Sequence, residues 1–72
     1  MELPVGYSDR AIEEILKLAK KEVEDEYGFF EIPISVKGDI FDKCKKAAKE
    51  YNPQVAYEGA KSDMIRFLTR GF

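Results

Sequence analysis

The sequence predicts a small α+β domain of two layers, in which two helices cover one face of a small, mainly antiparallel sheet. Three observations predict it. Hydrophobic residues recur at helical spacing in residues 9–25 and 39–51, apolar and polar residues alternate through residues 30–37, and a second alternation follows Asn52-Pro53. The expected order is therefore helix, strand, helix, strand, strand, in a single domain that covers residues 1–72.

The first helix is expected from Asp9 to about Asp25. Ser8 is a typical N-cap residue, and Gly28 is a typical residue just beyond a helix C-terminus. The apolar residues between them recur at intervals of three and four, as the buried stripe of a helix requires. They are Ile12, Ile15, Leu16, Ala19 and Val23. Residues 1–7 are expected to form an irregular lead-in.

Residues 30–37 form the expected central strand, because successive side chains of a strand point to opposite faces of the sheet. The side chains expected to face the helices are Phe30, Ile32, Ile34 and Val36. Proline has no backbone N–H to donate, so Pro33 predicts an edge strand or a bulge. Gly38 is expected to end this strand.

The second helix is expected to begin at Asp39 and to stop at Asn52-Pro53, because a residue before proline avoids the helical region. Its apolar stripe is Ile40, Cys44, Ala47, Ala48 and Tyr51. Cys44 is the sole cysteine, so it cannot form an intrachain disulfide. Its place in the stripe predicts a small buried side chain rather than a nucleophile.

The last third of the chain contains the main ambiguity. Residues 54–58 alternate as a strand, and residues 59–63 are expected to form a loop. Residues 64–70 fit either a second strand of a hairpin or a helix capped by Ser62 and stopped by Gly71. The strand is preferred, because two strands alone would make only a marginally stable sheet.

The composition excludes several kinds of chemistry. The chain has no histidine and one cysteine, so neither a Ser-His-Asp or Cys-His arrangement nor a structural zinc set can form. Its five glycines are too scattered for a phosphate-binding loop. No stretch approaches the roughly 20 apolar residues that cross a bilayer. We therefore expect a cytoplasmic protein that is not an enzyme and has no cofactor, no metal, no membrane partner and no small-molecule ligand.

Binding remains, and the preferred hypothesis is a small regulatory module that binds a protein partner and associates with itself. A chain of this length buries only about 60% of its unfolded surface, and this one has no disulfide or metal to stabilise it. In the preferred strand, Met64 and Leu68 would form an exposed apolar patch beside Arg66 and Arg70. Arginine is enriched at such interfaces.

The alternative hypothesis is a nucleic-acid-binding protein that uses its basic half. Residues 1–36 carry a net charge of −5, whereas residues 37–72 carry +3. The basic residues proposed to contact phosphates are Lys43, Lys45, Lys46, Lys49, Lys61, Arg66 and Arg70. An isoelectric point near 5.1 opposes this hypothesis, because dedicated nucleic-acid binders are usually basic overall.

Overall fold

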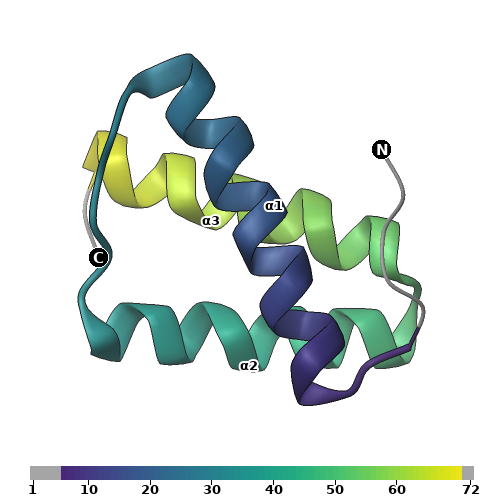
Figure 1. The fold of residues 1–72 in the computed structure, drawn as a ribbon. Helices are drawn as coiled ribbons and strands as arrows, with labels where there is room; N and C mark the ends of the chain where they lie inside the picture. The colour runs from purple at the N-terminus through teal and green to yellow at the C-terminus, as the bar shows by residue number, and fades with distance from the viewer. Residues whose placement is uncertain (1–5, 71–72) are drawn as a thin grey trace.

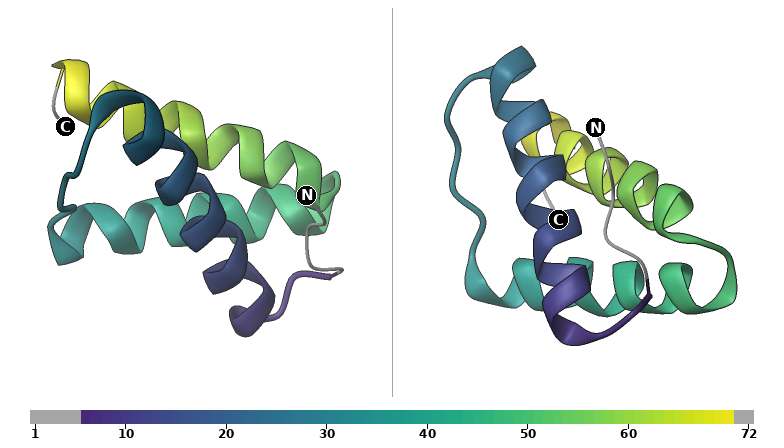
Figure 2. Two further views of the ribbon diagram at one scale, coloured as in Figure 1. Left: turned by 45° about the horizontal axis from the view of Figure 1, so that its top comes forward. Right: turned by 45° about the vertical axis from the view of Figure 1, so that its right-hand side comes forward.

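A computed structural model of the chain describes residues 6–70 and contains three helices, α1 (Asp9–Tyr27), α2 (Ile34–Glu50) and α3 (Pro53–Arg70). Helices α2 and α3 run side by side in opposite directions, and α1 crosses them diagonally (Figure 1). The same arrangement is visible from two further directions (Figure 2). The expected α+β class is therefore wrong: residues 6–70 form a small all-α bundle without a strand.

Helix α1 confirms the sequence prediction for this segment. Ser8 Oγ accepts a hydrogen bond from the Ala11 N–H at 3.3 Å and so caps the first turn. At the other end, Gly28 has a φ of 93° and its N–H donates to the Glu24 carbonyl at 2.8 Å. This left-handed conformation favours glycine. The five residues of the predicted stripe are all buried: Ile12, Ile15, Leu16, Ala19 and Val23.

The predicted strand over residues 30–37 is wrong. Residues 28–33, which we call the linker, join α1 to α2, and Ile34 begins α2. Pro33 occupies the N-cap position, and its carbonyl accepts the Lys37 N–H at 2.9 Å. The side chains expected to face the helices together are not all buried: Phe30 is 7% exposed, whereas Ile34 is 89% exposed. A lone strand has no neighbour to satisfy its backbone groups, and within residues 6–70 the segments predicted to supply one are helical.

Helix α2 begins before Asp39, the predicted cap, and contains Gly38 in its interior. A helical glycine costs about 1 kcal/mol relative to alanine, which does not stop a helix held by tertiary packing. The predicted stripe is largely confirmed, since Ile40, Cys44 and Ala48 are buried and Ala47 is partly buried. Tyr51, at the C-cap position, departs from it with an exposed fraction of 70%.

Helix α3 replaces the predicted hairpin, so the preferred strand over residues 64–70 and the loop over residues 59–63 are both wrong. The Asn52 side-chain oxygen accepts the Val55 N–H at 2.9 Å, which caps the helix, and Pro53 takes the first helical position. Asn52-Pro53 thus ends one helix and starts the next. The helical alternative had the right type of structure for residues 64–70 but the wrong start, Ser62, and its expected stop, Gly71, lies outside the described residues.

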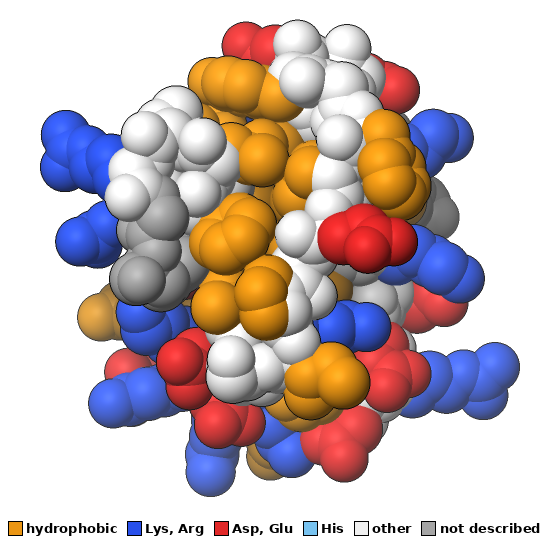
Figure 3. Space-filling view, turned by 90° about the vertical axis from the view of Figure 1, so that its left-hand side faces the viewer, with side chains coloured by type: hydrophobic (Ala, Val, Ile, Leu, Met, Phe, Trp, Pro, Cys, Tyr) orange, Lys and Arg blue, Asp and Glu red, His pale blue; other side chains and the backbone are white. Residues whose placement is uncertain are grey.

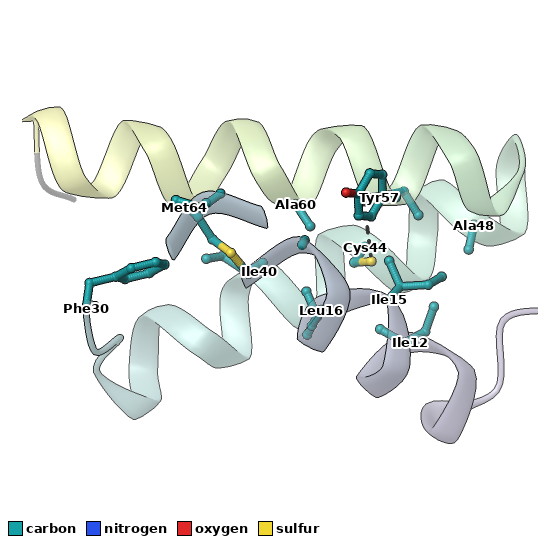
Figure 4. Packing of buried hydrophobic residues seen from close by; sticks show 13 residues of the cluster. Ile12, Ile15, Leu16, Phe30, Ile40, Cys44, Ala48, Tyr57, Ala60 and Met64 are labelled. Carbon is teal, nitrogen blue, oxygen red and sulfur yellow. Dashed lines mark hydrogen bonds between the residues drawn. The ribbon is translucent and has the colours of Figure 1, made fainter. Parts of the chain in front are cut away.

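The core lies between the three helices and is closed at one end by Phe30 from the linker (Figure 4). The largest side chains with almost no exposure are Ile12, Ile15, Val23 and Ile40. From α3, the buried residues are Ala56, Tyr57, Ala60 and Met64, which are spaced as one helical stripe. The residues of the predicted lead-in before Gly6 lie outside the described part of the chain.

Candidate binding surface

A groove opens between α1, the linker and the first half of α2. It has a volume of about 680 Å³. Its apolar lining comes from Leu16, Ile32, Ile40, Phe41 and Met64. Ile40 and Met64 are also core residues, with exposed fractions of 1% and 2%, so the groove reaches down to the core.

The divergence of α1 and α2 explains the groove's position. Near the start of α1, the Lys45 ammonium of α2 donates a hydrogen bond of 2.6 Å to the Asp9 carboxylate. Towards the other end the two helices separate, and the linker connects them (Figure 1). Helix α1 packs more extensively on α3 than on α2. The side of α1 that faces α2 is therefore only partly covered.

The rim of the groove carries charged side chains of both signs. Three are acidic and three are basic: Glu13, Glu14, Glu31, Lys17, Lys20 and Lys37. Lys20 is held in place by several contacts. Its ammonium lies 3.3 Å from Glu24 Oε2, 5.4 Å from the centroid of the Phe29 ring and 5.5 Å from that of Phe30. These distances place Phe29 beside the groove.

Two large apolar side chains project into solvent next to the groove. Phe29 is 79% exposed and Ile34 is 89% exposed. We call the surface made by Phe29, Ile34 and the groove the linker face. Figure 3, which views the end of the molecule that carries the linker, shows a band of hydrophobic side chains surrounded by charged ones. Larger exposed apolar patches with a polar rim are typical of interaction sites.

The lysines predicted from α2 lie among acidic residues. Lys45, Lys46 and Lys49 line one shallow hollow together with Asp42 and Glu50. The hydrogen bond to Asp9 raises the pKa of Lys45, and the negative charge of that carboxylate adds to the rise. The Lys49 ammonium lies 5.7 Å from the centroid of the Tyr7 ring. Lys43, the remaining candidate from this helix, is exposed.

The candidates from α3 do not line that hollow. Arg66 and Arg70 are exposed, and the Lys61 ammonium lies 5.2 Å from the centroid of the Tyr57 ring. Leu68 is partly buried against the core. Met64 is 2% exposed, so the expected exposed patch of Met64 and Leu68 is not formed, and Met64 contributes to the floor of the groove instead.

Cys44 is buried as predicted, with an exposed fraction of 3%. Its thiol donates a hydrogen bond to the Ala56 carbonyl oxygen at 3.7 Å, the dashed line in Figure 4. Burial raises the pKa of this thiol to about 11, and the negative charge of Asp63 adds to the rise. A thiol with so high a pKa is protonated at neutral pH, which makes it a poor nucleophile.

Sequence reasoning missed the linker face because it assigned residues 30–37 to a strand and placed Ile34 on its buried side. One signal pointed to the observed structure. Pro33 is followed by Ile34, Ser35 and Val36, and the four-residue steps from Val36 to Ile40 and Cys44 continue one helical stripe. If a helix starts at Pro33, then Ile34 falls in its first turn and lies outside the stripe formed by Val36, Ile40 and Cys44.

Within residues 6–70, no three or more cysteine, aspartate or glutamate side chains are grouped so that they could hold a metal ion. The three helices of this region also lack any apolar stretch of the length that a membrane crossing needs. Comparison of the chain with protein-family models, with curated proteins and with solved structures finds no match.

Proposed function

We propose that this protein is a binding module that acts through protein–protein contacts at the linker face. The observation that carries the proposal is the exposure of Phe29 and Ile34, at 79% and 89%. Phe29 contacts Lys20, which lines the groove, and Ile34 lies one helical turn before Lys37, which also lines it. Burying one such side chain fully is worth about 1.5–3 kcal/mol. A partner that covers both would gain that free energy.

The surroundings of these two side chains support the same function. Protein interfaces combine an apolar centre with a polar, solvent-accessible rim. The linker face has this composition, since the groove's apolar floor is bordered by six charged residues. The side chain of Lys20, packed over the Phe29 and Phe30 rings, keeps the linker close to α1. A surface that is already ordered loses less conformational entropy when it binds.

The nucleic-acid hypothesis receives less support from the geometry. Lys45 is paired with Asp9, and Lys46 and Lys49 share their hollow with Asp42 and Glu50. Neighbouring carboxylates reduce the attraction of such lysines for phosphates. The helical face therefore resembles an ordinary solvated surface of mixed charge.

Site-specific photo-crosslinking in cells tests the protein-binding proposal. A benzophenone amino acid replaces Phe29 in one variant and Tyr51 in a matched control, because Tyr51 is also an exposed aromatic residue, at 70%. Tyr51 lies at the turn between α2 and α3, away from the linker (Figure 1). The proposal expects an adduct with an identifiable protein from position 29, its loss when Ile34→Asp is added, and no such adduct from position 51. Equal adducts from both positions, or none from position 29, would contradict it.

Oligonucleotide titration tests the competing hypothesis directly. We expect no binding of duplex or single-stranded DNA or RNA by the purified protein at low salt. Binding that weakens steeply with added salt and disappears in the Lys45→Glu/Lys46→Glu/Lys49→Glu variant would favour a nucleic-acid function over the one proposed. The Phe29→Asp variant serves as the control, since it leaves these lysines unchanged.

A further inference from the structure

We infer that the partner of the linker face is a second copy of this chain, held by a two-fold symmetric contact. The inference rests on the proposed function, because it names the partner for the same surface. Three features of the linker face support it: its balanced charge, its combination of projecting and hollow apolar parts, and its size relative to the chain.

The charge on the rim is balanced. The lining contains three acids and three bases, so these six residues have no net charge: Glu13, Glu14, Glu31, Lys17, Lys20 and Lys37. A strongly acidic or strongly basic partner would meet as much repulsion as attraction there. A second copy presents the same mixture, and a two-fold rotation can place acids of one copy against bases of the other.

The apolar shape is also suited to a copy of itself. One surface carries both the projecting side chains of Phe29 and Ile34 and a hollow of about 680 Å³ with an apolar floor. The chain does not fill this hollow with its own Phe29, which remains 79% exposed. In a two-fold contact, each residue pair is formed twice, so the projections of each copy can enter the hollow of the other.

The size of the chain favours association as well. A standard interface takes about 800 Å² from each partner. The accessible surface is 5051 Å², so such an interface would cover about a sixth of it. Small chains bury a limited share of their surface on folding, and a partner that binds only the folded state stabilises that state.

Sedimentation of the purified chain of residues 1–72, from low micromolar to millimolar concentration, tests the inference. We expect a reversible equilibrium between the 8.3 kDa monomer and a species of twice that mass. Phe29→Ser and Ile34→Ser should each raise the dissociation constant about tenfold or more, because each change removes two apolar contacts per dimer. Tyr51→Ser, the matched control at another exposed aromatic residue, should leave it unchanged.

A charge exchange tests the symmetric contact. Lys17→Glu/Lys37→Glu makes the rim acidic, and Glu14→Lys/Glu31→Lys makes it basic; all four residues are exposed, so both variants should keep the helical spectrum of the wild type. Each variant alone should dimerise more weakly than the wild type, whereas an equimolar mixture should form a heterodimer. Absence of that heterodimer would overturn the two-fold arrangement.

The outcomes separate this inference from the proposed function. A monomer at every concentration, together with a position-29 adduct to a different identified protein in cells, would overturn the inference and leave the protein-binding function standing. A monomer without any position-29 adduct would overturn both. A dimer that Phe29→Ser and Ile34→Ser do not weaken would show that the copies meet elsewhere, which also contradicts the inference.

Discussion

The Sγ atom of Cys44, in α2, lies 3.7 Å from the carbonyl oxygen of Ala56, in α3. The contact joins two helices that pack closely along their length, and both residues are buried. It shows how closely α3 approaches α2 at this point, because only a small side chain fits between a helix and the backbone of its neighbour. Cys44 is thus a structural residue whose ionisation should be coupled to folding.

The first prediction concerns alkaline pH. Burial raises the pKa of the Cys44 thiol from 9.0 to about 11 in the folded protein, so the unfolded chain ionises first as the pH rises. The free energy of unfolding should therefore keep the full contribution of this thiol below pH 9 and lose it between pH 9 and about pH 11. A rise of this size corresponds to at most about 3 kcal/mol.

Urea unfolding of the wild type and Cys44→Ala across this pH range measures the effect. The variant should lose less stability, and the difference isolates the thiol because Tyr57 and Lys45, whose pKa values are also raised, remain in both proteins. If the free energy of unfolding falls equally with pH in the two proteins, ionisation of Cys44 is not coupled to folding and the prediction is wrong.

The second prediction contrasts Ile40, which is buried in α2, with Ile34, which the predicted strand would bury but which α2 leaves exposed. Ile40→Ala should lower the free energy of unfolding by about 2–5 kcal/mol, because Ile40 is 1% exposed and its removal leaves a cavity. Ile34→Ala should change it by no more than about 0.5 kcal/mol, because Ile34 is 89% exposed. Denaturant unfolding at low micromolar concentration measures both. A large loss from Ile34→Ala that does not depend on protein concentration would instead support a buried strand.

The third prediction uses two glycines in different backbone conformations. Gly59→Ala should raise the free energy of unfolding by about 0.5–1 kcal/mol, because Gly59 lies within α3 and no atom would crowd an added Cβ. Gly28→Ala should lower it, since Gly28 has a φ of 93° that alanine adopts only with strain. Thermal unfolding of both variants should give shifts of opposite sign. Destabilisation by Gly59→Ala would argue against a continuous α3.

The fourth prediction concerns the Tyr57 hydroxyl, which is buried and makes no hydrogen bond of ordinary geometry to residues 6–70. Burial raises the pKa of Tyr57, and the nearby negative charge of Glu22 adds to the rise. An interaction of the hydroxyl with the Glu22 carboxylate also contributes to that rise, but its geometry is not that of a well-formed hydrogen bond. Tyr57→Phe should therefore leave the melting temperature at neutral pH unchanged or higher. Above pH 10 the variant should lose less stability than the wild type, since the unfolded tyrosine ionises first. A clearly lower melting temperature of Tyr57→Phe at neutral pH would show that the hydroxyl makes a stabilising hydrogen bond, which contradicts this prediction.

The fifth prediction tests the start of α3. Asn52→Ala removes the side-chain oxygen that accepts the Val55 N–H, so it should lower the free energy of unfolding by about 1 kcal/mol. Asn52→Asp, which keeps an acceptor at the cap, is the control and should retain most of the stability. Chemical denaturation of the two variants gives the comparison. Equal losses would show that the cap does not stabilise α3.

Local signals within the sequence determined α1 and the middle of α2. The cap at Ser8, the glycine at position 28 and the apolar stripe of α1 all indicate the same helix, and the tertiary contacts of the folded chain are consistent with it. The stripe through Ile40, Cys44 and Ala48 likewise fixed which side of α2 is buried. The absence of histidine and of a second cysteine also limits the chemistry that the chain can perform, whichever fold it adopts.

Only the tertiary structure decided the remaining segments. Residues 54–58 alternate, yet Ala56, Ala60 and Met64 also recur at four-residue intervals, so their pattern satisfies a strand and a helix alike. Packing on α1 and α2 selects the helix, which satisfies its own backbone hydrogen bonds and buries that four-residue stripe. Once residues 53–70 are helical, residues 30–37 have no strand beside them, and Ile34 is left in solvent next to the groove. The linker face thus arises from how three helices meet, a long-range property that the periodicity of one segment does not specify.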